Sequence, residues 1–329
     1  MGRKAVSDVI MESDVIRSTD VNLFGTSISI KNYLCAKNGC PYEEKKKPVK
    51  LQLSVCPTSY CGAVCPFCSA GMLPHGGTAE KKFIDTAKLE KVIRELHDRD
   101  MIRGVSLTGG EPFTDAELLN EIIEMVFDIC GIETEISINT NGSGLGKLDR
   151  IKRLAFVDTI HISRHHYDDA RNEAYFKTRV ATSGEIKGIV DIVKDRKLFV
   201  YNCLLLKDGI GTYEEMVKFL EFAAETGVPK VGFVTPMAVN DYTRENRVSY
   251  TTLFEQGHGS EGLLYTVGYE DFEFCHCRDG VYAASNGSLV EFYGRETLPV
   301  RCGYARGLVY GADNVLRTGF GKDAVVVLS

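Results

Sequence analysis

The chain has 329 residues, of which 44% are hydrophobic and 26% are charged, and its formal net charge is −6. This length suffices for a barrel-sized core with a smaller appended module, and the negative charge argues against a nucleic-acid partner. No apolar run has the length of a transmembrane helix, and residues 1–20 mix charges throughout, unlike a signal peptide. We therefore expect a cytoplasmic protein with no membrane partner, whose 11 cysteines are metal ligands or buried thiols rather than disulfides.

Residues 1–48 are expected to form an N-terminal arm, in which residues 21–30 show the alternation of a strand. The arm contains Cys35 and Cys40, close to Gly39 and Pro41. We interpret both cysteines as reduced thiols in a surface turn, with extra cluster ligands as the alternative.

A regular alternation of strand-like and helical patterns begins at residue 49. The strand-like runs cover residues 49–55, 105–108, 134–139, 159–163, 198–206 and 230–235. The helical patterns between them cover residues 87–99, 116–127, 183–193 and 213–226. Strands that alternate with helices predict an α/β fold with a parallel sheet, whose functional residues lie at the carboxyl ends of the strands.

Three cysteines, Cys61, Cys65 and Cys68, follow the first of these strands with the spacing C-x3-C-x2-C. Soft thiolate ligands select iron–sulfur clusters, zinc or Cu(I), and a closed structural zinc site has four ligands. Three neighbouring cysteines therefore fit a cubane iron–sulfur cluster that leaves one iron open for a cofactor.

A second motif, Leu107-Thr-Gly-Gly-Glu-Pro-Phe113, ends the apolar run of residues 102–107. Together with the cysteine motif it resembles the radical S-adenosylmethionine (SAM) enzymes. The resemblance covers roughly residues 49–240 and implies a partial (β/α)6 barrel of the TIM type. The N-terminal arm (1–48) would precede this barrel, and a small α+β module (241–329) would follow it.

The resemblance also implies roles for individual residues. In the family the three cysteines hold a [4Fe–4S] cluster, and SAM chelates the open iron through its amino and carboxylate groups. An aromatic residue before the third cysteine, here Phe67, lies near the adenine. The residues implied to hold the SAM amino group are Gly109, Gly110, Glu111 and Pro112. The candidates for contacts with the SAM ribose and carboxylate are Asn139, Asn141, Ser163 and Arg164, although Asn141-Gly142 is also typical of a turn.

Two adjacent histidines, His165 and His166, follow the fourth strand-like run. A histidine at the mouth of a barrel is a candidate proton donor or acceptor, so these two are the candidate catalytic residues. Neighbouring residues of a strand point in opposite directions, so at most one of them faces the site. The alternative is that both are ordinary polar loop residues.

Three more cysteines, Cys275, Cys277 and Cys302, lie beyond the barrel and flank a segment that is typical of a hairpin turning at Asn286-Gly287. This region resembles the Twitch and SPASM modules of radical SAM enzymes and is similar to the C-terminal part of the family that rearranges GTP. We expect a second [4Fe–4S] cluster here. The alternatives are structural thiols or a zinc site. The C-x-C spacing and the missing terminal glycine pair depart from the GTP-rearranging family and leave the substrate open.

The chemistry implied by the resemblance is reductive cleavage of SAM to a 5′-deoxyadenosyl radical, which takes a hydrogen atom from a bound small-molecule, nucleotide or peptide substrate. An electron donor such as flavodoxin or ferredoxin would supply the electron. One alternative is a peptide-modifying maturase. Another is a non-catalytic iron–sulfur or zinc-binding protein, which the Gly-Gly-Glu-Pro motif argues against because a structural metal site does not need it.

Overall fold

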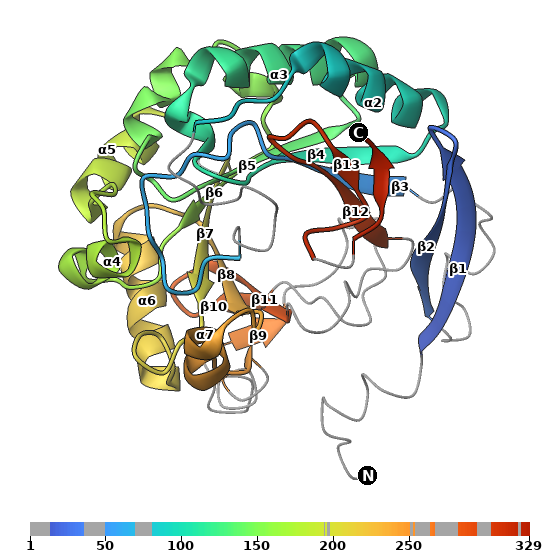
Figure 1. The fold of residues 1–329 in the computed structure, drawn as a ribbon. Helices are drawn as coiled ribbons and strands as arrows, with labels where there is room; N and C mark the ends of the chain where they lie inside the picture. The colour runs from blue at the N-terminus through green and yellow to red at the C-terminus, as the bar shows by residue number, and fades with distance from the viewer. Residues whose placement is uncertain are drawn as a thin grey trace.

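The fold is a curved sheet with helices along its outer face, as the computed structural model shows (Figure 1). The structure describes residues 14–35, 50–69, 81–193, 195, 198–250, 253, 264–266, 282–294, 304–321 and 324–329. Among these residues no helix combines the length and the apolar character needed to cross a membrane.

Six parallel strands form the centre of the sheet, and each pairs with its neighbour in chain order. They are β3 (Lys50–Val55), β4 (Ile102–Leu107), β5 (Glu135–Thr140), β6 (Thr159–Ser163), β7 (Phe199–Leu204) and β8 (Lys230–Thr235). Their bounds lie within three residues of those predicted from the sequence, and the predicted α/β partial barrel is confirmed.

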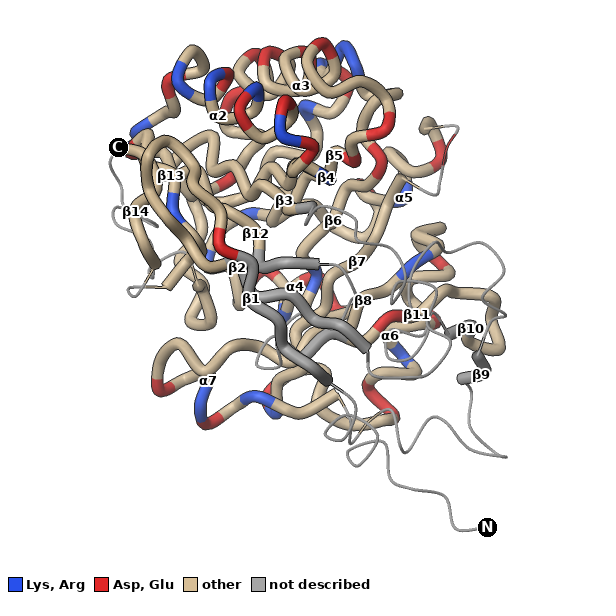
Figure 2. Tube along the Cα trace, turned by 90° about the vertical axis from the view of Figure 1, so that its right-hand side faces the viewer, with Lys and Arg blue, Asp and Glu red and all other residues tan. Residues whose placement is uncertain are grey.

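The helices cover the convex face of the sheet (Figure 1). The four predicted helices are α2 (Thr86–Asp98), α3 (Ala116–Cys130), α5 (Ser183–Ile192) and α6 (Tyr213–Glu225). Each has an apolar stripe that packs on the strands, and charged residues of both signs recur along α2 and α3 (Figure 2). The sequence did not predict α4 (Asp169–Phe176) and α7 (Asp241–Asn246), because both are too short to show a helical apolar repeat.

The two faces of the central strands differ in polarity. On β5 and β6 the isoleucines 136, 138, 160 and 162 are buried against the helices, whereas the alternate residues Ser137, Asn139, His161 and Ser163 are partly exposed. Side chains in ordinary TIM barrels fill the interior completely. Here the interior face carries accessible polar groups, which suits a barrel that admits a polar ligand.

Two strands from the C-terminal part of the chain extend the same sheet. β11 (Leu289–Gly294) lies parallel to β8, and β12 (Tyr304–Tyr310) lies parallel to β3 at the other edge. The predicted hairpin turn at Asn286-Gly287 is confirmed, because it joins β10 (Tyr282–Ala284) to β11 and Gly287 has a φ of 86°. The short strand β9 (Leu264–Thr266) pairs with β10.

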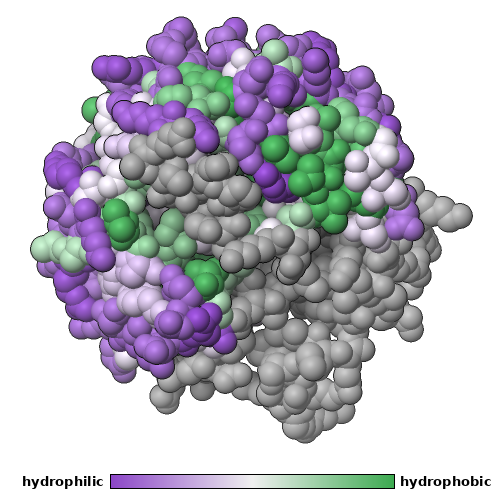
Figure 3. Space-filling view, viewed as in Figure 1, coloured by the Kyte–Doolittle hydropathy of each residue, from purple (hydrophilic) through white to green (hydrophobic). Residues whose placement is uncertain are grey.

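The remaining strands form two hairpins beside β12. The N-terminal arm contains β1 (Asp14–Leu23) and β2 (Thr26–Cys35), where the sequence predicted only strand character at residues 21–30. Phe24 and Gly25 make the turn with positive φ angles. The last hairpin comprises β13 (Leu316–Arg317) and β14 (Val326–Leu328). An apolar surface that includes Val325 and Val326 lies over this hairpin (Figure 3).

Candidate active site

The cysteine loop leaves β3 after Val55, at the carboxyl edge of the parallel sheet. Three other elements hold it in place. Val64 N donates to Phe176 O at the end of α4 (2.9 Å), and Ser59 N donates to Lys82 O ahead of α2 (3.0 Å). The side chain of Asn240, the N-cap of α7, donates from Nδ2 to Pro66 O (2.8 Å). Nothing in the sequence marked Asn240 as a partner of the cysteine loop.

The Gly-Gly-Glu-Pro segment lies directly against the cysteine loop. Gly110 N donates to Thr58 O (3.2 Å), and Glu111 N donates to Tyr60 O (2.8 Å). A Cβ atom on Gly110 would lie 2.1 Å from Tyr60 O, and one on Gly109, whose φ is +100°, would lie 2.6 Å from the Cβ of Cys56. Both positions therefore require glycine, because the backbones of the two motifs pass in contact.

The carboxylate of Glu111 joins the ends of β4 and β5. It accepts hydrogen bonds from Thr140 Oγ1 (2.7 Å), Asn141 N (2.8 Å) and Phe113 N (3.2 Å), and the residue is 3% exposed. Burial raises the pKa of Glu111, and these hydrogen bonds oppose the shift. Pro112 is also buried and begins the short 3-10 helix η2 (Pro112–Thr114). The structure thus gives both side chains a structural role where the resemblance implied contacts with SAM.

Three of the candidate SAM-binding residues lie on the interior face at the ends of β5 and β6. Asn141 Nδ2 donates to Cys61 Sγ at 3.4 Å, which links the end of β5 to the cysteine loop. Asn139 donates from Nδ2 to Ser106 Oγ (2.8 Å). Ser163 ends β6, and all three side chains are partly exposed. They are therefore accessible from the barrel interior, beside the cysteine loop.

Arg164, the candidate ligand of the SAM carboxylate, does not share this position. Its guanidinium donates to His166 O (2.8 Å), Tyr167 O (3.1 Å), Ala181 O (3.2 Å) and Asp169 Oδ1 (2.5 Å), and the side chain is 1% exposed. The guanidinium also lies 4.9 Å from the centre of the Phe222 ring on α6. Strand alternation explains this result, because the residue after Ser163 points to the helix layer.

His165 supports the aromatic residue of the cysteine loop. Its ring meets Phe67 edge to face at 4.7 Å and stacks on Phe176 at 5.2 Å. His165 Nδ1 accepts a hydrogen bond from Leu204 N (3.2 Å), so the proton of the neutral ring is on Nε2. Burial and, secondarily, the charge of Arg164 lower the pKa of His165 to about 3. A ring that stays neutral and buried fits a packing role better than proton transfer.

His166 points toward the helix layer instead. Its Nδ1 accepts from Asp168 N (2.9 Å), and the residue is 1% exposed. Burial is the main cause that lowers its pKa, followed by the charge of Arg171. The expectation that at most one of the two histidines faces the site agrees with this arrangement. Both histidines, the candidate catalytic residues, are buried in this structure.

The three motif cysteines form a donor set that suits iron. Cys61 and Cys65 are partly buried and Cys68 is exposed. Burial is the main cause that raises the pKa values of Cys61 and Cys65, and the charges of neighbouring motif cysteines add to it. Cationic iron would offset this repulsion between thiolates. Among the residues that the structure describes, no group converges on a single metal ion, and in a cubane cluster each cysteine binds a different iron.

Two of the other cysteines are buried in the core. Cys56 is 2% exposed and packs with Val309 and Phe320, and Cys203 is fully buried, so both are packing residues. Burial raises the pKa of Cys56 to about 12. Cys275, Cys277 and Cys302 lie outside the described residues, as does Cys40. The structure therefore does not test the second cluster.

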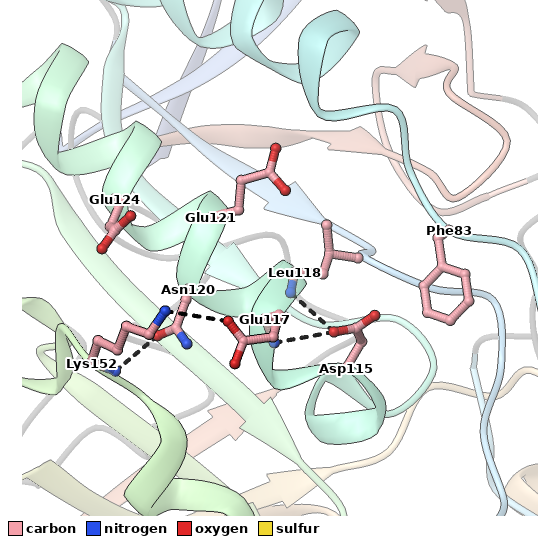
Figure 4. Close-up of a pocket in the computed structure, with 8 residues that line it drawn as sticks. All are labelled: Phe83, Asp115, Glu117, Leu118, Asn120, Glu121, Glu124 and Lys152. Atoms are coloured by element: carbon pink, nitrogen blue, oxygen red, sulfur yellow. Dashed lines mark hydrogen bonds and ion pairs between the residues drawn. The ribbon is translucent and has the colours of Figure 1, made fainter.

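A surface depression elsewhere on the protein is not part of this site (Figure 4). It lies on the outer face of α3 and is lined by Phe83, Asp115, Glu117, Leu118, Asn120, Glu121, Glu124 and Lys152. Its polar groups serve the fold, because Lys152 pairs with Glu117 (3.3 Å) and Asp115 caps α3. One lining residue, Phe83, pairs with Thr58 just before the cysteine loop, whereas most of the other lining residues belong to α3 and its N-cap.

The fold and the donor set together define an iron–sulfur enzyme built on a partial parallel barrel. Residues 55–222, just over half of the chain, match the sequence profile of the radical SAM superfamily. The chain belongs to the radical SAM superfamily and is a radical SAM enzyme. Enzymes of this superfamily use a [4Fe–4S] cluster and SAM.

Comparisons with individual proteins agree with this assignment. The chain is 29% identical over 192 residues to a probable GTP 3′,8-cyclase of Thermococcus kodakarensis, a match that covers 56% of this chain and 57% of the relative. It is 34% identical over 137 residues to a probable GTP 3′,8-cyclase of Sulfurisphaera tokodaii, covering 40% of this chain and 41% of the relative. The chain thus spans about half the length of the curated relatives it matches.

The fold is similar to that of solved structures. One is Streptococcus suis SuiB bound to S-adenosylmethionine, with a TM-score of 0.56 and 16% identity over 84% of this chain and 62% of that one. Another is anSMEcpe with bound AdoMet, with a TM-score of 0.54 and 16% identity over 83% of this chain and 76% of that one. At this level of identity the likeness concerns the fold alone.

Proposed function

We propose that this enzyme binds its cluster through Cys61, Cys65 and Cys68 and acts on a nucleotide held in the polar interior of the barrel. The observation that carries the cofactor assignment is the contact between the cysteine loop and the glycine pair, Gly109 and Gly110. When bound, the cluster and SAM supply a hydrogen-abstracting adenosyl radical. An electron donor such as flavodoxin or ferredoxin supplies the electron.

The residues of the chain position these groups. Phe67, supported by His165, offers an aromatic surface for the adenine. Asn141 lies beside Cys61, and the polar side chains of Asn139 and Ser163 face the same interior space, where they are available to the ribose and carboxylate of SAM. Glu111 acts indirectly, because its carboxylate fixes the backbone of Asn141.

The nucleotide substrate rests on two supports. Both curated relatives are named as probable GTP 3′,8-cyclases. The interior face of the barrel offers polar hydrogen-bonding side chains, among them Asn139 and Ser163, which suit a nucleobase and a ribose better than an apolar substrate. Peptide-modifying activity has no comparable support, because the likeness to solved structures concerns the fold alone.

We further propose that Cys275, Cys277 and Cys302 hold a second [4Fe–4S] cluster in the C-terminal region 241–329. The cysteine spacing supports this proposal. With Cys61, Cys65 and Cys68 all changed to alanine, the protein should retain about four iron atoms per chain. A folded triple variant that holds almost no iron would contradict the second cluster, and bound zinc in place of iron would favour a zinc site.

The test of the whole proposal is anaerobic turnover. Reconstituted enzyme with dithionite and SAM should form 5′-deoxyadenosine, and deuterium from ribose-labelled GTP should appear in that product. The triple cysteine variant should form no 5′-deoxyadenosine and should transfer no deuterium. If 5′-deoxyadenosine forms abundantly but carries no deuterium with every nucleotide of a labelled panel, the nucleotide substrate is contradicted. The SAM chemistry would still stand.

A further inference from the structure

The second half of the cysteine loop, from Cys65 to Cys68, forms a tight turn. Cys68 N donates to Cys65 O at 3.2 Å, so Pro66 and Phe67 occupy the two central positions. Proline is favoured at the first of these positions. Phe67 has no positive φ angle, which excludes a turn of type II. The turn therefore sets how Cys65 and Cys68, two of the three motif cysteines, lie relative to each other.

The sequence of this turn leaves one torsion angle of Pro66 free. The proline ring fixes the φ angle, and the peptide bond to Phe67 is planar. The ψ angle of Pro66 therefore decides the orientation of that peptide, and with it the direction of Pro66 O. Because proline has no N–H group, this oxygen is also the only backbone atom through which another element can hydrogen-bond to the residue.

Asn240 binds this oxygen from outside the loop. Its Nδ2 donates to Pro66 O at 2.8 Å, and among the described parts of the chain no other element hydrogen-bonds to residues 65–68. Its Oδ1 accepts from Thr243 N at 2.9 Å and caps α7. A flipped amide would place its NH2 group against Thr243 N and its oxygen against Pro66 O. The two contacts together therefore fix the orientation of the amide.

The helix that Asn240 caps is tied to the rest of the barrel. Tyr242 Oη of α7 donates to Asp208 Oδ2 at 2.8 Å, and Tyr175 Oη of α4 donates to Asp208 Oδ1 at 3.0 Å. The helix α4 in turn binds the first half of the loop, because its last residue accepts a hydrogen bond from Val64 N. The cysteine loop thus runs between two helices that Asp208 joins (Figure 1).

Packing of the Phe67 ring does not replace the contact with Asn240. The ring lies 4.7 Å from that of His165 and 5.9 Å from that of Tyr175, which supports the side chain of residue 67. Cys68 has no comparable support, because it is exposed and its N–H group bonds within the turn. Without the Asn240 contact, the turn alone would place Cys68.

We infer that Asn240 is a positioning residue of the cluster site. By binding Pro66 O it keeps the turn of residues 65–68 in one conformation, so that Cys68 stays in place to bind iron together with Cys61 and Cys65. This inference rests on the proposed cluster ligation by these three cysteines, and it adds a residue that their motif does not contain. Asn240 acts through the backbone of the loop.

The test uses Asn240→Ser and Asn240→Asp, which keep the cap of α7 and lose the contact with the loop. Serine and aspartate are both favoured N-caps, so either side chain can accept from Thr243 N. Serine is too short to reach Pro66 O as well. Aspartate has no N–H group and places a carboxylate against the carbonyl oxygen.

The matched control is Asn286→Ser, at the turn before β11. Asn286 Nδ2 donates to Leu220 O (2.9 Å), and its Oδ1 accepts from Ser288 N (3.0 Å). Serine at this position also removes one hydrogen bond to a backbone carbonyl and keeps an acceptor for the local N–H group. The apoproteins of the two serine variants should therefore unfold at about the same urea concentration.

The measurement is the rate at which a chelator removes iron from the reconstituted, anaerobically reduced protein. It is followed through the part of the cluster's EPR signal that responds to SAM, which separates this cluster from a second one. Iron leaves when the loop opens, so the rate follows the opening equilibrium. Loss of one hydrogen bond should raise the rate about fivefold in Asn240→Ser and at least as much in Asn240→Asp. Asn286→Ser should release iron at the wild-type rate.

The outcomes separate this inference from the cluster ligation on which it rests. A wild-type rate in folded Asn240→Ser and Asn240→Asp would show that Asn240 is only a helix cap, and the positioning role would fail alone. An equal acceleration in Asn286→Ser would also overturn it, because the rate would then follow overall stability. If the protein with Cys61, Cys65 and Cys68 all changed to alanine kept the SAM-responsive signal, the ligation and the positioning role would both fail.

Discussion

Replacement of Glu111 by alanine tests whether this residue of the Gly-Gly-Glu-Pro motif is a structural element or a direct ligand of SAM. The change removes the acceptor of three hydrogen bonds, from Thr140 Oγ1, Asn141 N and Phe113 N. Each hydrogen bond to a charged group contributes about 1.5–3 kcal/mol. The three share one carboxylate and are not additive.

Burial of the Glu111 carboxylate reduces the net stabilisation that these hydrogen bonds provide. It raises the pKa of Glu111, which means that the hydrogen bonds do not fully offset the loss of hydration of the charge. We therefore expect Glu111→Ala to lower the free energy of unfolding by about 3–4 kcal/mol, less than three full hydrogen bonds. Glu111→Gln keeps one acceptor oxygen and should cost about 2 kcal/mol.

The assay is anaerobic urea unfolding of the reconstituted protein, with SAM affinity measured in parallel. Glu121→Ala, an exposed glutamate on α3, is the control and should change the unfolding free energy by less than about 0.5 kcal/mol. A Glu111→Ala protein as stable as this control, but with SAM affinity reduced tenfold or more, would refute the structural role and restore the direct contact.

Three further predictions follow from other contacts. Gly110→Ala should abolish cluster retention, since its Cβ would lie 2.1 Å from Tyr60 O, and an iron content equal to wild type would contradict this. Between pH 6.5 and 5.5 the wild type should lose about 1.0 kcal/mol of stability through His165, because only the unfolded chain protonates this residue until the pH reaches about 3. His165→Phe should not show this loss when its unfolding free energy is measured at both pH values. An equal loss of stability in the wild type and in His165→Phe would refute the prediction. Arg164→Met should destabilise the protein by about 2–3 kcal/mol, because it loses the hydrogen bonds to three carbonyl groups and to Asp169. The folded variant should still bind SAM. A loss of SAM affinity without destabilisation would favour a role for Arg164 as a ligand of SAM.

The sequence was sufficient to predict the barrel and the cofactor because both depend on local patterns. Strand and helix periodicity is set by burial on one face, and the spacing of Cys61, Cys65 and Cys68 is a property of one short loop. The contact of Gly110 with Tyr60 could not be predicted in the same way. It joins segments about fifty residues apart, and only the position of β3 next to β4 brings them together.

Side-chain direction is the second limit on sequence reasoning. Arg164 and His165 are adjacent and both polar, and the motif gave each a role at the site. In the structure Arg164 points to the helix layer and His165 packs against Phe67, because the alternation of β6 continues two residues past its end. The pairing of β11 with β8 was likewise not indicated by the sequence, because it joins segments about sixty residues apart.

The pairing of β12 with β3 has a consequence for the biosynthesis of the protein. The strand that leads into the cysteine loop acquires this neighbour only after about 250 further residues have been made. At 5–20 residues per second this interval is about 12–50 s. During that time β3 is an edge strand, and the thiols that follow it are exposed to oxygen without their final support. Stable cluster insertion should therefore follow release of the chain from the ribosome, and oxygen during translation should damage this protein more than the same exposure after folding.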